Sequence, residues 1–179
     1  MSSATQHSYQ LLALFATTCI ALIFIASGGM KLFRPGEFVG VVRDFRVVPD
    51  VLAKPVAYAL PYLELCVGLF LLLDVYRNVF LTVAVILLSA FTIAIVINLV
   101  RGRTNISCGC FGSKNTELTW RLVVRNLSLA GVAIIGSIDN GQLTDFAAAE
   151  RFAVIFSIGA LITLYQLSAV IVRFWRLPS

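Results

Sequence analysis

The residues best suited to chemistry in this chain are two cysteines separated by one glycine, Cys108-Gly109-Cys110. Thiols at positions i and i+2 can form a small disulfide ring only where the backbone bends sharply, and glycine permits that bend. A strained disulfide is easily reduced, so the pair suits thiol-disulfide exchange. Three basic residues between positions 101 and 114 favour the thiolate, which is the form that attacks disulfides.

Two other roles are compatible with the same pair. From the tripeptide alone, a purely structural disulfide is as well supported as a redox-active one. A closed metal site needs about four ligands, and the chain offers only Cys108, Cys110 and the distant His7. We therefore expect no metal site.

One carboxylate and one guanidinium fall inside runs that are otherwise apolar. Glu64 lies in the run from 56 to 73, and Arg125 lies in the run from 122 to 138. A charge within a bilayer is costly unless it is paired or neutralised, so such a residue marks a candidate functional site. We expect Glu64 to pair with Arg125, with Lys31 as the second choice. A structural ion pair and a proton acceptor for quinone or thiol chemistry are both open.

Two further cysteines lie in the first two apolar runs. Cys19 comes eleven residues before Met30, and Cys66 comes ten residues after Val56, so both are expected about 15 Å from the same membrane face. Buried cysteine usually behaves as a small apolar side chain. If the two face each other, however, they form a second dithiol, which a relay of electrons across the membrane needs.

Helices of membrane-spanning length must position all of these groups. The mean hydropathy is +0.93, and 59% of residues are hydrophobic, against roughly 45 to 50% in a soluble domain. A bilayer core about 30 Å thick requires roughly 20 apolar residues of helix. Runs near this length cover residues 8–30, 56–73, 78–100, 121–138 and 152–173. We expect an all-α integral membrane protein, a compact bundle of four to five transmembrane helices forming one domain over residues 1–179.

The segment after the first span has a different pattern. Between residues 35 and 48, apolar side chains recur at helical spacing opposite charged ones. Pro35 can begin this helix and Pro49 can end it. The pattern predicts a short amphipathic helix in the membrane interface, which needs no function beyond closing the bundle.

Basic residues are distributed unevenly between the two sides of the predicted bundle. The loops at 31–55 and 101–121 and the C-terminal tail hold eleven Lys and Arg, whereas the other side holds only Arg77 and Arg151. Because basic loops stay in the cytoplasm, we expect the N-terminus outside it and the Cys-Gly-Cys loop, residues 101–119, inside it. The net charge of +5 then favours anionic membrane lipids as partners, and we expect no nucleic-acid partner.

The sequence around the cysteine pair has a specific resemblance. Cys-Gly-Cys-Phe-Gly at 108–112, preceded by Asn98-Leu-Val-Arg-Gly-Arg103, resembles the signature of the methylamine utilisation MauE family, in the MauE/DoxX group of small redox-associated membrane proteins. Other stretches agree with this resemblance: Ser27-Gly-Gly-Met-Lys31, Leu60-Pro-Tyr-Leu-Glu64, and Trp120 with Arg125-Asn126.

The resemblance implies a role in protein maturation. Proteins of this family are needed to produce the small subunit of methylamine dehydrogenase, a periplasmic protein that is rich in disulfides and carries a tryptophan-derived quinone. A thioredoxin-like partner, MauD, accompanies them. The resemblance thus implies a bacterial inner-membrane protein in which Cys108 and Cys110 exchange electrons with a MauD-type partner.

Two other functions compete with this one. The chain can be a non-catalytic assembly or scaffold protein, or a DoxX-like membrane subunit of a sulfur-oxidising enzyme, for which a quinone is a possible cofactor. A transporter is less well supported because broken helices and inverted repeats are not evident. For the maturation role, one conflict stands: the client is periplasmic, whereas the charges place the cysteine loop in the cytoplasm. Either electrons are relayed across the membrane, or the charge rule does not hold here.

Overall fold

The computed structural model describes residues 3–103, 118–137 and 154–157, with only the backbone for residues 3–7. Within these residues every regular element is an α-helix, which confirms the all-α class. The helices are α1 (Ser3–Phe33), α2 (Pro35–Phe45), α3 (Asp50–Leu72), α4 (Arg77–Val100) and α5 (Trp120–Gly136).

By its contacts, the chain divides into two compact units. The first covers residues 1–141 and contains all five helices, and the second covers residues 142–179. In the second unit the structure describes a short helical piece at residues 154–157. The rest of the expected span at 152–173 lies outside the described residues.

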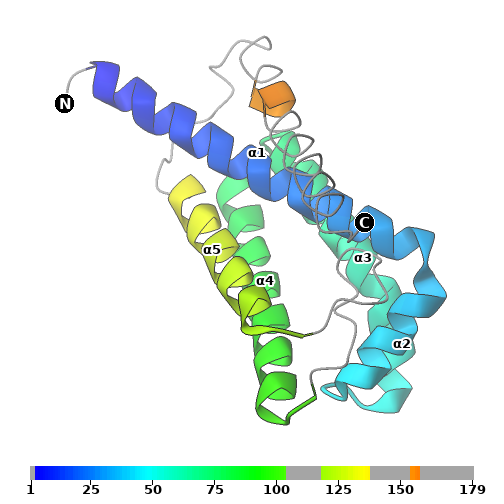
Figure 1. The fold of residues 1–179 in the computed structure, drawn as a ribbon. Helices are drawn as coiled ribbons and strands as arrows, with labels where there is room; N and C mark the ends of the chain where they lie inside the picture. Colours follow the sequence, from blue (N-terminus) through cyan, green and yellow to red (C-terminus); the bar gives the residue numbers. More distant parts are fainter. Residues whose placement is uncertain (1–2, 104–117, 138–153, 158–179) are drawn as a thin grey trace, which may run out of the picture. The chain divides into compact units, whose positions relative to one another are not determined.

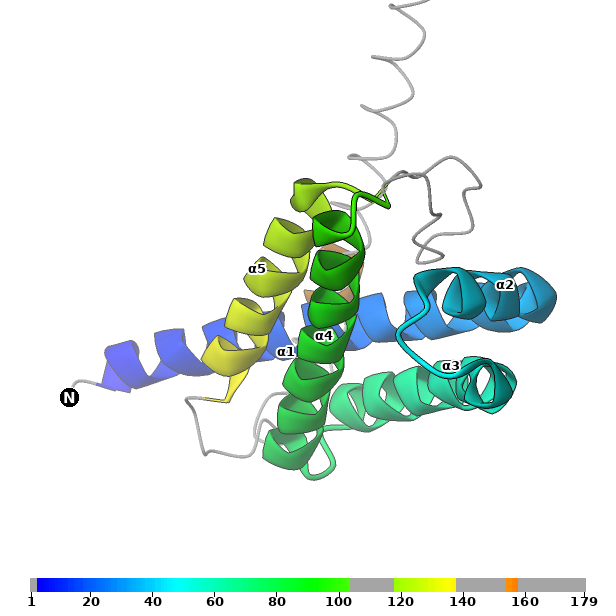
Figure 2. The same ribbon diagram turned by 90° about the horizontal axis from the view of Figure 1, so that it is seen from below.

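The first unit is built from two antiparallel helix pairs, α1 with α3 and α4 with α5, which cross one another (Figures 1 and 2). Apolar side chains from all four helices meet where the pairs cross, and α2 packs on α3 beside them. The fully or nearly fully buried residues of this core include Ile20, Phe24, Val67, Leu71, Leu81, Leu88 and Ala133. Because the pairs cross, α1, α3, α4 and α5 each contribute side chains to the interior of the unit.

Three of the described helices are long and apolar enough to cross a membrane: Ser8–Phe33 within α1, Asp50–Leu72 and Arg77–Val100. Many large apolar side chains on them are exposed, among them Tyr62, Leu69, Ile86 and Ile93. Such exposure is costly in water but favourable in lipid. The helix α5 has 17 residues and spans about 26 Å, less than the thickness of a bilayer core.

Two helix boundaries differ from the expected ones. The helix α3 begins at Asp50, six residues before the expected span, because a helix can extend beyond the uncharged part of its sequence and Pro49 precedes it as the N-cap. The amphipathic helix α2 begins at Pro35 as expected but ends at Phe45. Arg46 then takes a left-handed conformation (φ 45°) that terminates the helix.

Glycines allow α1 and α3 to approach closely. A Cβ atom added to Gly28 would lie 2.8 Å from the backbone oxygen of Pro61. One added to Gly68 would lie 2.9 Å from the backbone oxygen of Ala21. Small residues commonly permit such contact between membrane helices. The two contacts fix the antiparallel register of the pair.

We expect Gly28→Ala to destabilise the protein by about 1–3 kcal/mol, because the backbone of Pro61 must move to admit the methyl group. Gly29→Ala is the matched control, since a Cβ there meets nothing within 4 Å. It should leave stability unchanged or raise it by up to about 1 kcal/mol through helix propensity. Thermal unfolding in detergent micelles measures both. Equal stability of the two variants would contradict the close α1–α3 contact.

Candidate functional site

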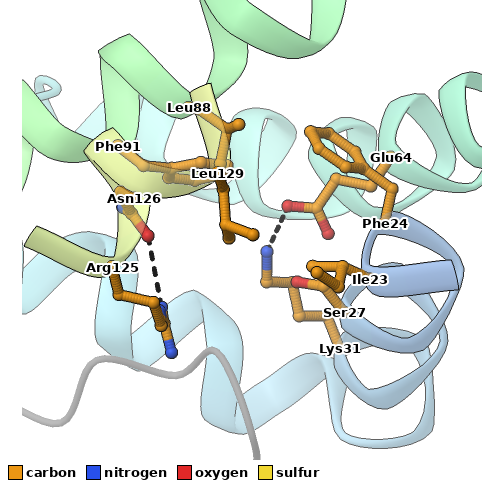
Figure 3. Close-up of a pocket in the computed structure, with 10 residues that line it drawn as sticks. All are labelled: Ile23, Phe24, Ser27, Lys31, Glu64, Leu88, Phe91, Arg125, Asn126 and Leu129. Carbon is orange, nitrogen blue, oxygen red and sulfur yellow. Dashed lines mark hydrogen bonds and ion pairs between the residues drawn. The ribbon is translucent and has the colours of Figure 1, made fainter. Parts of the chain in front are cut away.

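A cavity of about 200 Å³ lies inside the first unit, where α1, α3, α4 and α5 meet. Its walls are mostly apolar, and its polar groups come from three different helices. Figure 3 shows the lining residues: Ile23, Phe24, Ser27, Lys31, Glu64, Leu88, Phe91, Arg125, Asn126 and Leu129. A mostly apolar pocket with a few converging polar groups is the usual form of a small-molecule site.

The central polar contact of this cavity is an ion pair between Lys31 of α1 and Glu64 of α3 (Figure 3). Lys31 Nζ donates to Glu64 Oε1, and both side chains are only 2% exposed. Among the described residues, Glu64 therefore pairs with the second-choice partner, and the expected pair with Arg125 is not formed. Arg125 nevertheless lines the same cavity.

Lys31 reaches inward because of its place on the helix. Side chains in an α-helix point back towards the N-terminus, so a lysine in the last turn of α1 extends along the helix into the bundle. Its ammonium lies 5.0 Å from the ring centre of Phe38 and 4.8 Å from that of Phe91. These cation–π contacts help to offset the cost of burying the charge. They also connect α2 and α4 to the ion pair.

The second oxygen of the Glu64 carboxylate is buried and makes no hydrogen bond within the described residues. The hydroxyl of Ser27 lies near the same carboxylate and also lines the cavity. A buried acceptor without a donor costs free energy. The carboxylate can therefore accept a hydrogen bond from a molecule in the cavity.

Arg125 and Asn126, at the start of α5, lie at the other side of the cavity (Figure 3). Arg125 Nη2 donates to Asn126 Oδ1 at 3.4 Å, and Asn126 is 4% exposed. Together with Lys31 and Glu64, they give the cavity donors and an acceptor on facing walls. This arrangement can bind a polar group on a small apolar molecule.

The cavity is also where the sequence stretches quoted for the MauE resemblance meet. Ser27 and Lys31 come from the first stretch, Glu64 from the second, and Arg125 with Asn126 from the third. They are far apart in sequence and come from three helices. Their convergence makes the cavity the best-defined candidate site among the residues that the structure describes.

Sequence reasoning missed Asn98 as a positioning residue. Its side chain is fully buried, and its Nδ2 donates to the backbone oxygens of Phe45 and Ala94, both at 3.0 Å. The first bond ties the end of α2 to α4. An uncharged polar residue near the C-terminal end of the apolar run of 78–100 was the available signal.

Cys108 and Cys110 lie outside the described residues, but both ends of their loop are described. At its start, the N–H of Gly102 (φ 69°) donates to Leu99 O, and that of Arg103 donates to Asn98 O, each at 3.0 Å. This is the Schellman arrangement that ends many helices. At the other end, Leu118 is 1% exposed and packs with Ile95 and Val123. The two ends are thus fixed at one end of the α4–α5 pair.

Cys19 and Cys66 do not face each other, so the condition for a second dithiol is not met. Both are free thiols, and Cys66 is exposed on the face of α3 away from the buried Glu64. In the register set by the glycine contacts, Cys66 is level with Ile25, six residues from Cys19. That separation is about 9 Å along the helix, too far for a disulfide. The cysteines are offset because the contacts at Gly28 and Gly68, and not the helix ends, set the register of α1 against α3.

Within the described ranges, no three His, Cys, Asp or Glu side chains are grouped so that they could hold a metal ion.

Comparison with known proteins supports a single family. The family model for methylamine utilisation protein MauE matches residues 9–139. The chain is 41% identical over 116 residues to methylamine utilization protein MauE of Paracoccus denitrificans, covering 64% of this chain and 62% of that protein. It is 45% identical over 111 residues to the MauE protein of Methylorubrum extorquens, covering 61% and 60%.

A third relative, the MauE protein of Methylophilus methylotrophus, is 37% identical over 124 residues. It is matched over 68% of this chain and 65% of its own length. The chain thus spans about three fifths of the length of the curated relatives it matches. No solved structure matches it. Because the family model covers residues 9–139, which is well over half of the chain, this protein belongs to the methylamine utilisation protein MauE family.

Proposed function

We propose that this membrane protein acts in methylamine utilisation by supporting the maturation of the methylamine dehydrogenase small subunit through thiol-disulfide exchange. The observation that carries the proposal is the position of Cys108-Gly109-Cys110 inside the segment matched by the MauE family model, residues 9–139. The relatives are named for methylamine utilisation. A client rich in disulfides requires a dithiol chemistry, and this loop offers two neighbouring thiols.

The exchange needs two thiols that cycle. In the oxidised form, a disulfide between Cys108 and Cys110 accepts two electrons from a dithiol of the client, which becomes a disulfide, and the loop takes up two protons as it becomes a dithiol. A thioredoxin-like partner of the MauD type then reoxidises the loop. The disulfide of the partner accepts the two electrons and becomes a dithiol. Each half is an attack of a thiolate on a disulfide sulfur, with a mixed disulfide as intermediate.

The fixed ends of the loop support this role. The Schellman turn at Gly102 ends α4 and the buried Leu118 precedes α5, so both flanks of the segment are anchored. Arg101 and Arg103 stand at the beginning of the loop, and basic residues favour thiolates. The described structure thus provides a stable base for an exchange-active loop.

The proposed location is the bacterial inner membrane, with the N-terminus outside the cytoplasm. The support is the distribution of basic residues, eleven on one side and two on the other. On this topology the cysteine loop is cytoplasmic, whereas direct exchange with a periplasmic client requires the loop on the opposite face. The membrane-impermeant maleimide in the test below distinguishes the two orientations. Since Cys19 and Cys66 are not adjacent, they do not provide a relay between this loop and the opposite face.

The test uses the variant Cys19→Ala/Cys66→Ala, in which the loop thiols are the only two left. We expect this variant to retain full function, because Cys66 is exposed on the outer face of α3 and neither thiol is bonded to another cysteine of the described residues. Trapping with a maleimide in intact cells should find Cys108 and Cys110 partly oxidised. Deletion of the thioredoxin-like partner should shift the two cysteines towards the reduced dithiol, because that partner reoxidises the loop.

A membrane-impermeant maleimide in the same experiment reports which face of the membrane carries the loop. If the two thiols keep one redox state whether or not the partner and the client are present, the pair only shapes the loop and the exchange proposal fails.

A further inference from the structure

We propose that the cavity between α1, α3, α4 and α5 binds a membrane-soluble molecule whose head is a single hydroxylated aromatic ring, either a phenol or a hydroquinone. This goes beyond thiol exchange, because the cavity is a ligand site formed by other residues. Its polar contact is the Lys31–Glu64 pair, and its apolar walls include Phe24 and Phe91.

The volume of the cavity fits one ring. An apolar protein cavity of about 150 Å³ holds benzene. A cavity of about 200 Å³ therefore accommodates a benzene ring with a few small substituents. The flanking rings of Phe24 and Phe91 offer the faces and edges against which an aromatic ligand packs well.

The polar end of the cavity selects a hydroxyl group. Glu64 Oε2 is buried and has no hydrogen bond from a described residue, so a ligand that donates to it removes an existing cost. The Lys31 ammonium has three N–H groups, and one is used in the ion pair with Glu64. A hydroxyl can donate to the carboxylate and accept from the ammonium at once.

Other ligand classes fit less well. A pure hydrocarbon leaves Glu64 Oε2 without a donor, and so does an anion that carries no N–H or O–H group. The lining residues Ile23, Leu88 and Leu129 are apolar and lie on helices within the hydrophobic part of the bundle. These walls favour a ligand that dissolves in the bilayer and presents one polar group at its head.

The probe is thymol, a substituted phenol of suitable size, compared with para-cymene, which has the same carbon skeleton without the hydroxyl. The full chain is purified in dodecylmaltoside, and thermal unfolding is followed as each compound is titrated. We expect thymol to raise the melting temperature saturably, and para-cymene to bind at least about tenfold more weakly. Because para-cymene enters micelles more readily, non-specific partitioning would give the opposite order.

Two variants locate the site. Leu129→Phe fills the cavity and should abolish the saturable shift with thymol. Leu127→Phe makes the same change on the 58% exposed face of α5 and should bind thymol as the unmodified chain does. Equal binding of thymol and para-cymene, or of thymol by the two variants, would overturn the proposal. If Leu129→Phe does not fold, the comparison of the two compounds on the unmodified chain still decides.

The outcome is separable from the proposed function. A chain with both Cys108→Ser and Cys110→Ser should bind thymol unchanged, since none of the described residues that line the cavity is a cysteine. If the chain cycles its loop thiols but does not bind thymol, only the ligand site is overturned. If it binds thymol but its loop thiols do not cycle, only the exchange reaction is overturned.

Discussion

Replacing either Cys108 or Cys110 with serine should reduce methylamine dehydrogenase activity to the level of a strain that lacks this protein. An exchange reaction needs one thiolate to attack and a second thiol to resolve the mixed disulfide, so a single thiol leaves the reaction trapped. A disulfide between residues i and i+2 closes a very short loop, so it contributes little to stability. The variants should therefore insert and fold normally.

The measurement is enzyme activity of the client in cells, together with the amount of membrane-inserted variant protein. The controls are Cys19→Ala and Cys66→Ser, which change thiols on α1 and α3 and should leave activity unaffected. A Cys108→Ser/Cys110→Ser double variant that supports full client activity would remove the redox hypothesis and favour a scaffold role.

Breaking the ion pair between Lys31 and Glu64 should have the largest effect on stability. Both side chains are 2% exposed, so Glu64→Gln leaves a buried ammonium and Lys31→Met leaves a buried carboxylate. Loss of one partner of a buried pair typically costs about 3–5 kcal/mol. The double variant Lys31→Met/Glu64→Gln should recover most of that loss, because it removes both charges and leaves neither one buried without a partner.

Arg125→Leu supplies the matched comparison for this cycle. In the described structure Glu64 pairs with Lys31, so Glu64→Gln and Arg125→Leu should have nearly additive effects on thermal unfolding in micelles. Strong coupling of Glu64 to Lys31 with weak coupling to Arg125 is the expected pattern. The opposite pattern would show that the guanidinium is the true partner of the carboxylate.

The all-helical class, the amphipathic segment and the candidate charges were all predictable from local sequence. Apolar runs of span length require helices because backbone polar groups cannot be left unpaired in lipid. Pro35 and the spacing of apolar residues after it indicated α2, although its end at Phe45 depended on the backbone turn at Arg46. Glu64 stood out because a carboxylate in an apolar run needs a partner.

Which residue pairs with Glu64 could not be read from the sequence. The sequence pattern placed Lys31 in the loop at 31–55. In the structure α1 continues to Phe33 and directs the lysine back into the bundle, between Phe38 and Phe91. Arg125 lies inside an apolar run of the sequence, as Glu64 does, and was therefore the preferred partner. In the structure it lies across the cavity, where its Nη2 donates to the side chain of Asn126. Side-chain direction and helix crossing decided the pairing.

By itself, the sequence determined that this protein has helices long and apolar enough to span a membrane, a Cys-Gly-Cys motif and charges within apolar runs, because each follows from residue types within a short window. The tertiary structure alone decided that Cys19 and Cys66 are apart, and that Ser27, Lys31, Glu64 and Asn126 surround one cavity. Depth along a helix can be counted in residues, but register and rotation depend on packing between helices. Here the contacts at Gly28 and Gly68 set the register of α1 against α3.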